Sequence, residues 1–476
     1  MTTNSLSRTG SAPAVTESSP EDLEILRYLL DLALQPLDRF DGFTHAEQML
    51  LSALRYQLNG LCWALTLAQR TRTPAFTGYL AEAQRNAITK MCDKRVWKYW
   101  WKQELIGYGR WNPDPIAHHN VMYSAYLGVM IGLYETLNAD AIFDQPGSLT
   151  LRWNERRSYL YDFGSLAEAI QRNMLERPDS PQYPCEPHLV YPVCNTYALN
   201  TLRMHDRLHG STLTGDLVDR VRESYDRDRW RRPDGRFYSG RTRAGRIAFL
   251  PPILTNDAWM AYWLHSPMPD IATHTWDMLR ERFITLSGTE VTITGAPEKR
   301  IDPGNYSLVN GGGPTYAILA KAARELGDED LAHALQELLA RQFPLAHAGG
   351  AARHTGLSTL GNVLAAMARF GGAGVTADLI DGNLPHEWTT GPVLAEAAYP
   401  EVQVARAVTD GRGLDLVLYP GTGDPVNTVL GIGRLAPGTT YRVTGNPLDH
   451  ITAEADGSAL IPVRLHGRTE IRLHPV

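Results

Sequence analysis

The chain is poor in cysteine, with four in 476 residues. So few cysteines in this length do not form a disulfide framework, and we therefore expect free thiols in a reducing compartment. The first eighteen residues are polar and lack the apolar run of a secretory signal. Together these absences predict a cytoplasmic protein.

The chain also lacks an excess of positive charge and long apolar runs. Its formal net charge of -6 argues against a nucleic-acid partner. We see no apolar segment long enough to span a bilayer and expect no membrane span. With a length that can bury a large core, this composition is typical of one large globular domain with an appendage.

Sequence motifs for cofactors and metals are missing as well. The patterns GxGxxG, GxxxxGK[ST] and HExxH do not occur. His118 and His119 are adjacent, so on a helix they point to different sides, and no carboxylate or cysteine lies at ligand spacing. We therefore expect neither a cofactor nor a metal.

Helical periodicity dominates the first four fifths of the chain. Ser19 and Pro20, followed by two acids, form a helix start, and Thr44 with Glu47 predicts a capping box for a second helix. Further helical patterns lie near 79–92, 118–138, 164–176, 195–209, 215–228, 255–265, 272–284, 314–326, 330–342 and 357–369. Paired helices of this length, without a solenoid repeat, favour an alpha/alpha barrel.

The pattern changes near residue 385, where short alternating strands with Gly-rich turns replace helical periodicity. We predict a mainly α fold, an (α/α)6 barrel with a small C-terminal antiparallel β domain. The boundaries would be 1–18 for a disordered N-terminus, 19–384 for the barrel and 385–476 for the β appendage. A short hairpin is expected within 234–249.

One stretch, Cys185 to Asn195, concentrates reactive groups. It holds two of the four cysteines, nine positions apart, with Glu186 beside the first. Pro187 and Pro192 favour a stiff loop, with a helix beginning near Asn195. Two thiols and a carboxylate could transfer protons, and they could equally be buried structural groups.

Four stretches together resemble the linalool dehydratase-isomerase family: KMCDKRVWKYW (90–100), NVMYSAYLGVMIGLY (120–134), CEPHLVYPVCN (185–195) and DRLHG (206–210). The likeness runs from about residue 25 to about residue 370. It implies an alpha6/alpha6 barrel, cofactor-independent acid/base chemistry on an apolar isoprenoid alcohol or alkene, and a homo-oligomer. The polar N-terminus and the β-rich C-terminus lie outside it.

The resemblance also assigns residues. Cys185 and Cys194 match the family's active-site cysteines, and Glu186 follows the first in both. Asp31 is the best match for an N-terminal catalytic aspartate. Met122 and Tyr56 match pocket residues, and Trp259 and Tyr191 would add aromatic wall.

Three departures from the family fall at polar positions. Tyr126 stands where the family has a histidine, and we expect it to donate a hydrogen bond or line the pocket. Thr255 replaces a tyrosine at the pocket wall. A second tyrosine, expected near Leu37 or Asp38, is missing. The fold therefore transfers better than the substrate.

The leading hypothesis is a lyase or isomerase with Cys185 and Cys194 as its proton-transfer pair. The nearest alternative is a terpenoid cyclase that uses the same pocket without net loss of water. A carbohydrate-active α/α-barrel enzyme would need two facing carboxylates, for which Glu186 and Asp257 are the nominees. The fourth hypothesis is a non-catalytic binder of a hydrophobic ligand.

Overall fold

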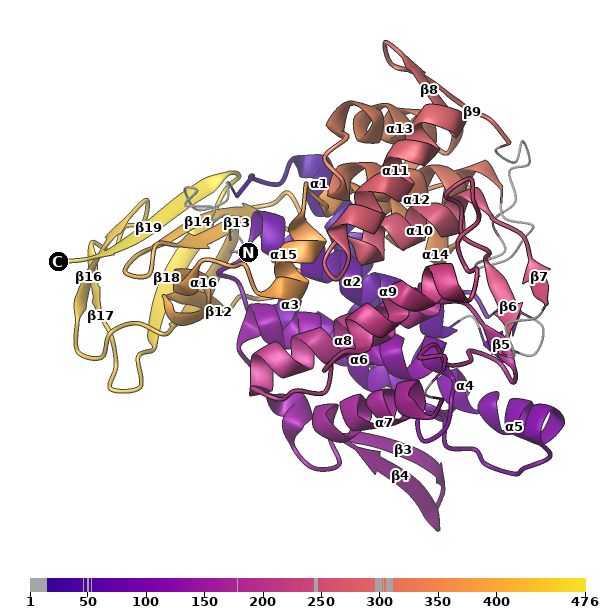
Figure 1. Ribbon diagram of the computed structural model, residues 1–476. Helices are drawn as coiled ribbons and strands as arrows, with labels where there is room; N and C mark the ends of the chain where they lie inside the picture. The colour runs from indigo at the N-terminus through magenta and orange to yellow at the C-terminus, as the bar shows by residue number, and fades with distance from the viewer. Residues whose placement is uncertain are drawn as a thin grey trace, which may run out of the picture. The chain divides into compact units, whose positions relative to one another are not determined.

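The computed structural model describes residues 15–45, 47–48, 51–52, 54–177, 179–243, 247–295, 302, 304 and 311–476. It divides the chain into two compact units (Figure 1). The helical unit comprises Pro20–Ala68 and Gly78–Asn383. The β unit comprises Gln69–Thr77 and Leu384–Val476 together with the described residues up to Ser19. Sequence analysis did not foresee that Gln69–Thr77, inside the predicted barrel, groups with the C-terminal residues.

The helical unit is mainly α, as predicted. Its helices are α1 (Pro20–Ala33), α2 (Leu54–Arg72, of which the last residues belong to the β unit), α3 (Gly78–Met91), α4 (Lys94–Trp97), α5 (Trp100–Tyr108), α6 (Val121–Asn138), η1 (Ile142–Asp144), α7 (Phe163–Leu175), α8 (Pro192–His209), α9 (Leu217–Arg227), α10 (Leu254–Leu264), α11 (Pro269–Phe283), α12 (Gly312–Glu325), α13 (Glu329–Gln342), α14 (Thr359–Phe370) and α15 (Val375–Asp381). Most begin within three residues of the periodic patterns, because buried apolar positions and caps set their limits.

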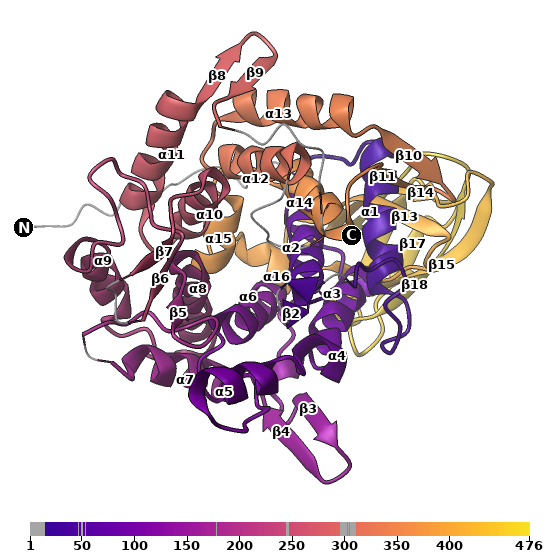
Figure 2. The ribbon, with the colours of Figure 1, turned by 90° about the vertical axis from the view of Figure 1, so that its right-hand side faces the viewer.

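Within this unit the even-numbered long helices contact one another in chain order. In Figure 2, α6, α8, α10, α12 and α14 lie toward the middle, and α7, α9, α11 and α13 lie toward the rim. The contacts are Tyr56 with Met122 (α2 to α6), Thr201 with Ala125 (α8 to α6), Asn200 with Trp263 (α8 to α10), Lys321 with Trp259 (α12 to α10) and Gly60 with Val363 (α2 to α14); α12 also packs on α14. A six-fold barrel requires such contacts between successive inner helices, and we interpret the arrangement as one.

Helices α6 and α8 run parallel and very close together. A Cβ added to Gly128 would lie 2.3 Å from the Thr201 side chain, and one added to Gly132 would lie 2.8 Å from Met204. Only glycine permits this approach. Because the pairs advance along both helices in the same direction, the C-terminal ends of α6 and α8 lie together.

Small antiparallel hairpins project from the helical unit. They are β1–β2 (Glu47–Gln48, Leu51–Ser52), β3–β4 (Leu149–Asn154, Arg157–Tyr161), β8–β9 (Ile284–Ser287, Glu290–Ile293) and β10–β11 (Leu345–Ala348, Ala351–His354). A three-stranded sheet joins β5 (Leu189–Val190), β6 (Gly240–Thr242) and β7 (Ala248–Leu250). The last two strands lie where a hairpin was expected, although Arg246 is outside the described residues.

The β unit contains two antiparallel sheets and the short helix α16 (His386–Thr390). One sheet has the order β12 (Val393–Glu396), β15 (Val426–Gly433), β18 (Ala459–Leu465). The other has the order β13 (Val402–Thr409), β14 (Leu414–Pro420), β19 (Thr469–Pro475), β16 (Thr440–Thr444), β17 (His450–Thr452). Ala75 exchanges backbone hydrogen bonds with Leu394 and Ala407, and this ties Gln69–Thr77 into the unit.

Two sequence predictions concerning the N-terminal part differ from the structure. The second helix starts at Leu54, ten residues later than the predicted cap at Thr44. The Gln57 side chain accepts from the Thr44 N–H at 2.8 Å and donates to its carbonyl at 2.7 Å, which fixes Thr44 in a loop. Of the segment predicted to be disordered, residues 1–14 lie outside the described residues, whereas Ser18 donates a backbone hydrogen bond to Ala405.

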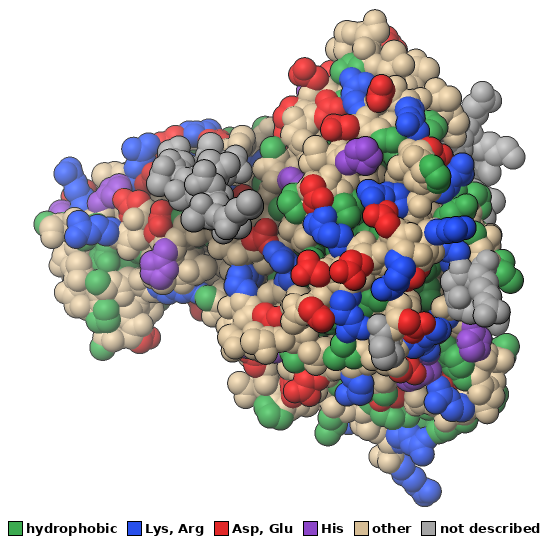
Figure 3. Space-filling view, viewed as in Figure 1, with side chains coloured by type: hydrophobic (Ala, Val, Ile, Leu, Met, Phe, Trp, Pro, Cys, Tyr) green, Lys and Arg blue, Asp and Glu red, His purple; other side chains and the backbone are tan. Residues whose placement is uncertain are grey.

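Among the described residues, no single helix passes the length and hydropathy test for a membrane span, although α14 and α15 pass it as a pair bent by 87°. On the face shown in Figure 3, acidic and basic side chains are interspersed.

Candidate active site

A tight turn and a helix start position the two cysteines. Cys185 donates its backbone N–H to Leu189, which closes a turn through Glu186 that needs His188 at a φ of 65°. Helix α8 then begins at Pro192, because proline suits the first helical position. Cys194 therefore lies in the first turn of α8. The prediction that the loop extends to Asn195 was wrong by three residues.

Asn195 fastens the segment of Cys185 to the helix of Cys194. Its side-chain oxygen accepts from the N–H of Tyr183 at 2.9 Å, and its amide nitrogen donates to the carbonyl of Tyr183 at 3.1 Å. The same nitrogen donates to the carbonyl of Tyr191. The amide beside the second cysteine thus has a positioning role that the sequence did not reveal.

The two predicted cysteines lie near each other, and both are shielded from solvent. Both are buried, and they are close enough for Cys194 to affect the pKa of the Cys185 thiol. Burial raises the pKa of Cys185 well above its usual value, and Cys194 and Glu186 raise it further. The Tyr126 hydroxyl lies 3.7 Å from the Cys194 sulfur. Cys185 is therefore a neutral thiol rather than a thiolate at neutral pH.

Arg55 is a member of this cluster that sequence analysis missed. It is fully buried, lies over the rings of Tyr56 and Tyr99 at 4.2 and 4.5 Å, and donates to the Tyr56 hydroxyl at 2.7 Å. The Tyr56 hydroxyl in turn lies 3.0 Å from the Met122 sulfur. The predicted pocket pair of Tyr56 and Met122 is thus brought together around a buried positive charge.

Glu186 supplies the negative charge that faces Arg55. Burial raises the pKa of Glu186, while Arg55 and a hydrogen bond from the Tyr191 hydroxyl lower it. No donor among the described residues reaches its Oε2, which is shielded from solvent. An acceptor of this kind is available to a substrate proton or hydroxyl.

Aromatic rings form a wall next to Cys194. Tyr126 packs on Tyr197 with centroids 4.0 Å apart, Tyr197 packs on Trp263 at 4.5 Å, and Trp63 contacts all three rings. Trp259 stacks parallel to Trp263 at 6.3 Å. Of these, sequence analysis named Tyr126 and Trp259. Ring faces of this kind attract developing positive charge.

Beyond Trp259, the wall carries a buried lysine. The Lys321 Nζ lies 3.2 Å from the ring centroid of Trp259 and 3.3 Å from that of Tyr262. Burial lowers its pKa well below the usual value, with Glu325 opposing the shift. No acceptor among the described residues bonds its nitrogen.

The other predicted residues lie farther from the thiols or are less enclosed. Asp31, matched to a catalytic aspartate, is about half exposed and pairs with Arg27 at 2.9 Å on α1. Thr255 is half-buried in the first turn of α10, one helical turn before Trp259. Tyr191 is half-buried and packs edge-on against Phe249. The catalytic role of Asp31 remains a prediction.

Asp257, nominated for a carbohydrate-active site, is engaged elsewhere. It is buried, forms an ion pair with Arg236 at 2.8 Å and accepts the N–H of Phe237 at 2.9 Å. Burial raises its pKa to about 6, and these two contacts oppose that shift. Both of its oxygens serve the fold.

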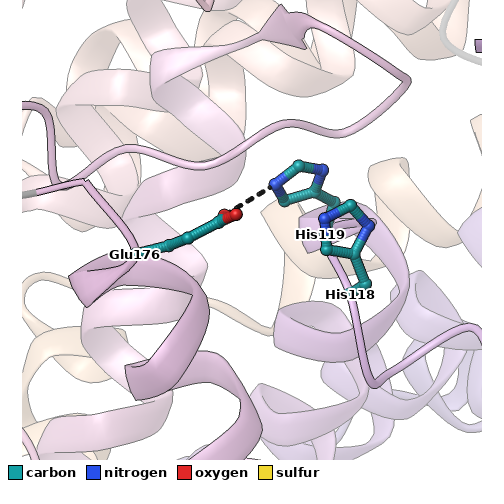
Figure 4. A group of neighbouring side chains, drawn as sticks. All are labelled: His118, His119 and Glu176. Atoms are coloured by element: carbon teal, nitrogen blue, oxygen red, sulfur yellow. Dashed lines mark hydrogen bonds and ion pairs between the residues drawn. The ribbon is translucent and has the colours of Figure 1, made fainter. Parts of the chain in front are cut away.

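The adjacent histidines were expected to point to different sides of a helix, but they precede α6 and their ring centroids lie 3.6 Å apart, near Glu176 (Figure 4). His119 lies 3.0 Å from Glu176, and ligand atoms of His118, His119 and Glu176 are close enough to surround a cation. Arg243, however, approaches His119 at 2.8 Å and Glu176 at 2.6 Å. Its guanidinium already supplies positive charge to these ligand atoms.

The fold and the site define a mainly helical protein with a buried thiol pair, a carboxylate facing a buried guanidinium, and an aromatic wall. The sequence profile of the linalool dehydratase/isomerase family matches residues 55–360. That is more than half of the chain, and the protein belongs to this family.

Solved structures give a weaker likeness. An inactive variant of an alpha-1,6-mannanase from Salegentibacter sp. HEL1_6, in complex with alpha-1,6-mannotriose, has a TM-score of 0.44 at 11% identity, covering 77% of this chain and 99% of that one. An unsaturated glucuronyl hydrolase from Streptococcus agalactiae has a TM-score of 0.43 at 12% identity, covering 76% of this chain and 98% of that one. At these scores the likeness assigns no activity.

Proposed function

We propose that this protein is a cofactor-independent lyase/isomerase that dehydrates or isomerises a small apolar, isoprenoid alcohol. The observation that supports it best is the proximity of two buried thiols, Cys185 and Cys194, to each other and to the carboxylate of Glu186. Membership of the family supports the same reaction class. The barrel interpretation would place this cluster inside an enclosed, water-poor interior.

The groups present suffice for a balanced dehydration. The Cys185 thiol donates its proton to the substrate hydroxyl, which leaves as water with the electron pair of the C–O bond. The Glu186 carboxylate removes a proton from the neighbouring carbon, and that C–H electron pair forms the alkene. Proton transfer from Glu186 through Cys194 to the Cys185 thiolate restores the starting state. Isomerisation is the return of water to another carbon of the same allylic system.

The surroundings favour this chemistry over hydrolysis of a polar substrate. Tyr126, Tyr197 and Trp63 offer ring faces to positive charge that develops as the C–O bond breaks. Arg55 keeps a compensating charge near Glu186, so that the carboxylate can ionise although it is buried. Exclusion of water strengthens both effects.

The test is turnover of linear terpenoid alcohols and alkenes in heavy water, analysed by gas chromatography–mass spectrometry. We expect deuterium in the product of the wild type, and at least about a 100-fold loss of turnover in Cys185→Ala and Cys194→Ala. Cys92→Ala is the matched control, because Cys92 is a thiol outside the cluster whose pKa burial raises to about 12.

Three outcomes would contradict the proposal. A cyclic product would indicate the cyclase instead, and tight binding of a terpenoid without turnover would indicate a binder. Equal turnover in the two alanine variants and in the wild type would remove the thiols from the mechanism.

A further inference from the structure

A second cluster of potential ligands lies at the far end of helices α6 and α8. Glu135 is near the C-terminal end of α6, Asp144 ends η1, and His209 is the last residue of α8. The His209 Nε2 lies 3.3 Å from Glu135 and 3.5 Å from Asp144, and ligand atoms of all three fall within 4.8 Å of one another. One cation could contact all three.

The chain is shaped to bring Asp144 back over Glu135. Ala139 ends α6 in the left-handed region, with a φ of 50°, and donates its N–H to the carbonyl of Glu135. Reversal of the chain there places η1 beside the helix it has just left. A residue other than glycine in this conformation is uncommon, so the turn is tightly specified.

The position has more negative than positive charge. Two carboxylates face one imidazole, and α6 and α8, which run parallel, both direct their C-terminal ends toward it. Helix C-termini carry partial negative charge and favour cations. The nearby Arg207 is directed elsewhere, donating to Thr136 and to the carbonyl of Ile380.

Glu135 provides an independent indication of a ligand. Its side chain is 4% exposed, yet no donor among the described residues reaches its Oε1. Burial, with Asp144 and Asp140 nearby, raises its pKa to about 8. A buried carboxylate oxygen without a partner is costly, and a cation would satisfy it.

The cluster of His118, His119 and Glu176 shows the contrast (Figure 4). It has comparable ligand spacing, but the Arg243 guanidinium bonds both His119 and Glu176. Among the described residues, no lysine or arginine forms an ion pair with Glu135 or Asp144. The two clusters therefore differ in whether the protein supplies its own cation.

We infer that Glu135, Asp144 and His209 form a binding site for a divalent first-row transition-metal cation, of which Zn²⁺ is the probe. One imidazole nitrogen and two carboxylate oxygens suit such a cation, and the partial exposure of His209 and Asp144 leaves room for a water ligand. His209 is fifteen residues along α8 from Cys194, about 22 Å at the helical rise, so the site is separate from the thiols. Its role is to hold the ends of α6 and α8 and the loop between α6 and η1.

The experiment uses the tag-free full chain after chelator treatment. Zn²⁺ is titrated by calorimetry, and Co²⁺ is titrated by visible absorption, which reports nitrogen and oxygen ligation. We expect one Zn²⁺ per chain in the wild type, at least tenfold weaker binding in Glu135→Gln, and loss of the Co²⁺ spectrum in His209→Gln. Glu176→Gln is the matched control from the cluster that Arg243 neutralises, and it should bind as the wild type does.

Thermal unfolding separates loss of the site from loss of the fold. Without metal, Glu135→Gln should unfold at or above the wild-type Tm, because it removes a buried charge; with Zn²⁺, the Tm of the wild type should rise and that of the variant should not. If Glu135→Gln does not fold, the half-exposed Asp144→Asn replaces it. Absence of saturable binding, or equal binding in all variants, would overturn the inference. Neither readout depends on terpenoid turnover.

Discussion

Asn195 bonds both backbone polar groups of Tyr183, two residues before Cys185, and sits directly after Cys194 in the chain. One buried side chain thereby sets the separation of the two thiols. The pairing is reciprocal, since the amide accepts from the N–H and donates to the carbonyl. A loop rich in proline and aromatic residues gains its fixed geometry from this contact as much as from its own stiffness.

Replacing Asn195 with Ala should destabilise the fold and impair the thiol pair. The backbone N–H and carbonyl of Tyr183 would lose their partner in a buried position, which costs about 2–4 kcal/mol. Urea unfolding measures this cost, and turnover should fall more than the population of folded protein. Asn195→Asp keeps the acceptor and loses the donor, so it should be intermediate. Full activity in Asn195→Ala would show that the hydrogen bonds from Asn195 to Tyr183 are not needed to position the thiols.

Replacing Arg55 with Met should shift the pH dependence of turnover. Arg55 lowers the pKa of Glu186 against the effect of burial, so its removal raises that pKa. If Glu186 acts as the base, the acid limb of kcat/KM against pH should move up by about 1 unit or more. Arg55→Lys retains the charge and should move it less. An acid limb unchanged in Arg55→Met would exclude Glu186 as the base.

The lowered pKa of His119 should make the folded protein less stable as the pH falls below neutrality. Burial, together with His118 and Arg243, lowers the pKa of His119 to about 3. The unfolded chain takes up this proton near pH 6.5, whereas the folded protein does not, so acidification favours unfolding by at most about 1.4 kcal/mol per pH unit. Between pH 6.5 and 5, His119→Gln should show a flatter dependence of the unfolding free energy. The exposed His347→Gln is the control, and equal slopes in all three proteins would refute the assignment.

Replacing Lys321 with Met should stabilise the protein at pH 7. Burial lowers the pKa of Lys321 well below its usual value, so the unfolded chain binds more protons than the folded protein, and stability rises with pH up to the unfolded pKa. The methionine variant avoids this cost and should gain at least about 1 kcal/mol at pH 7, with the gain disappearing near pH 10. Lys98→Met, at an exposed position, should change little. A less stable Lys321→Met would mean that the rings of Trp259 and Tyr262 hold an ammonium.

Local patterns were informative where local physics decides the outcome. Helices such as α6, α10 and α12 lie close to their predicted ranges. The repeat of apolar residues along a helix and the residues that cap it are both set by neighbours in the sequence, so they can be recognised without the fold. The start of the second helix was predicted wrongly, because the side chain of Gln57, thirteen residues away, hydrogen-bonds the backbone of Thr44. The exposure of Asp31 has a different cause. This residue follows Arg27 by one helical turn on the exposed side of α1, and the leucines around it face the other way.

The sequence by itself determined the helical class and the strand-rich C-terminal part, and it nominated Cys185 and Cys194, since composition, periodicity and a family motif are all read along the chain. Only the tertiary structure decided that Arg55 is buried opposite Glu186 and that Asn195 sets the thiols in place. It alone brought Glu135, Asp144 and His209 together. Most charged residues of folded proteins are exposed, and the burial of one such as Arg55 depends on a partner, here Glu186, more than a hundred residues away along the chain. Such partners meet only when the helices pack, and no period or spacing along the chain encodes that meeting.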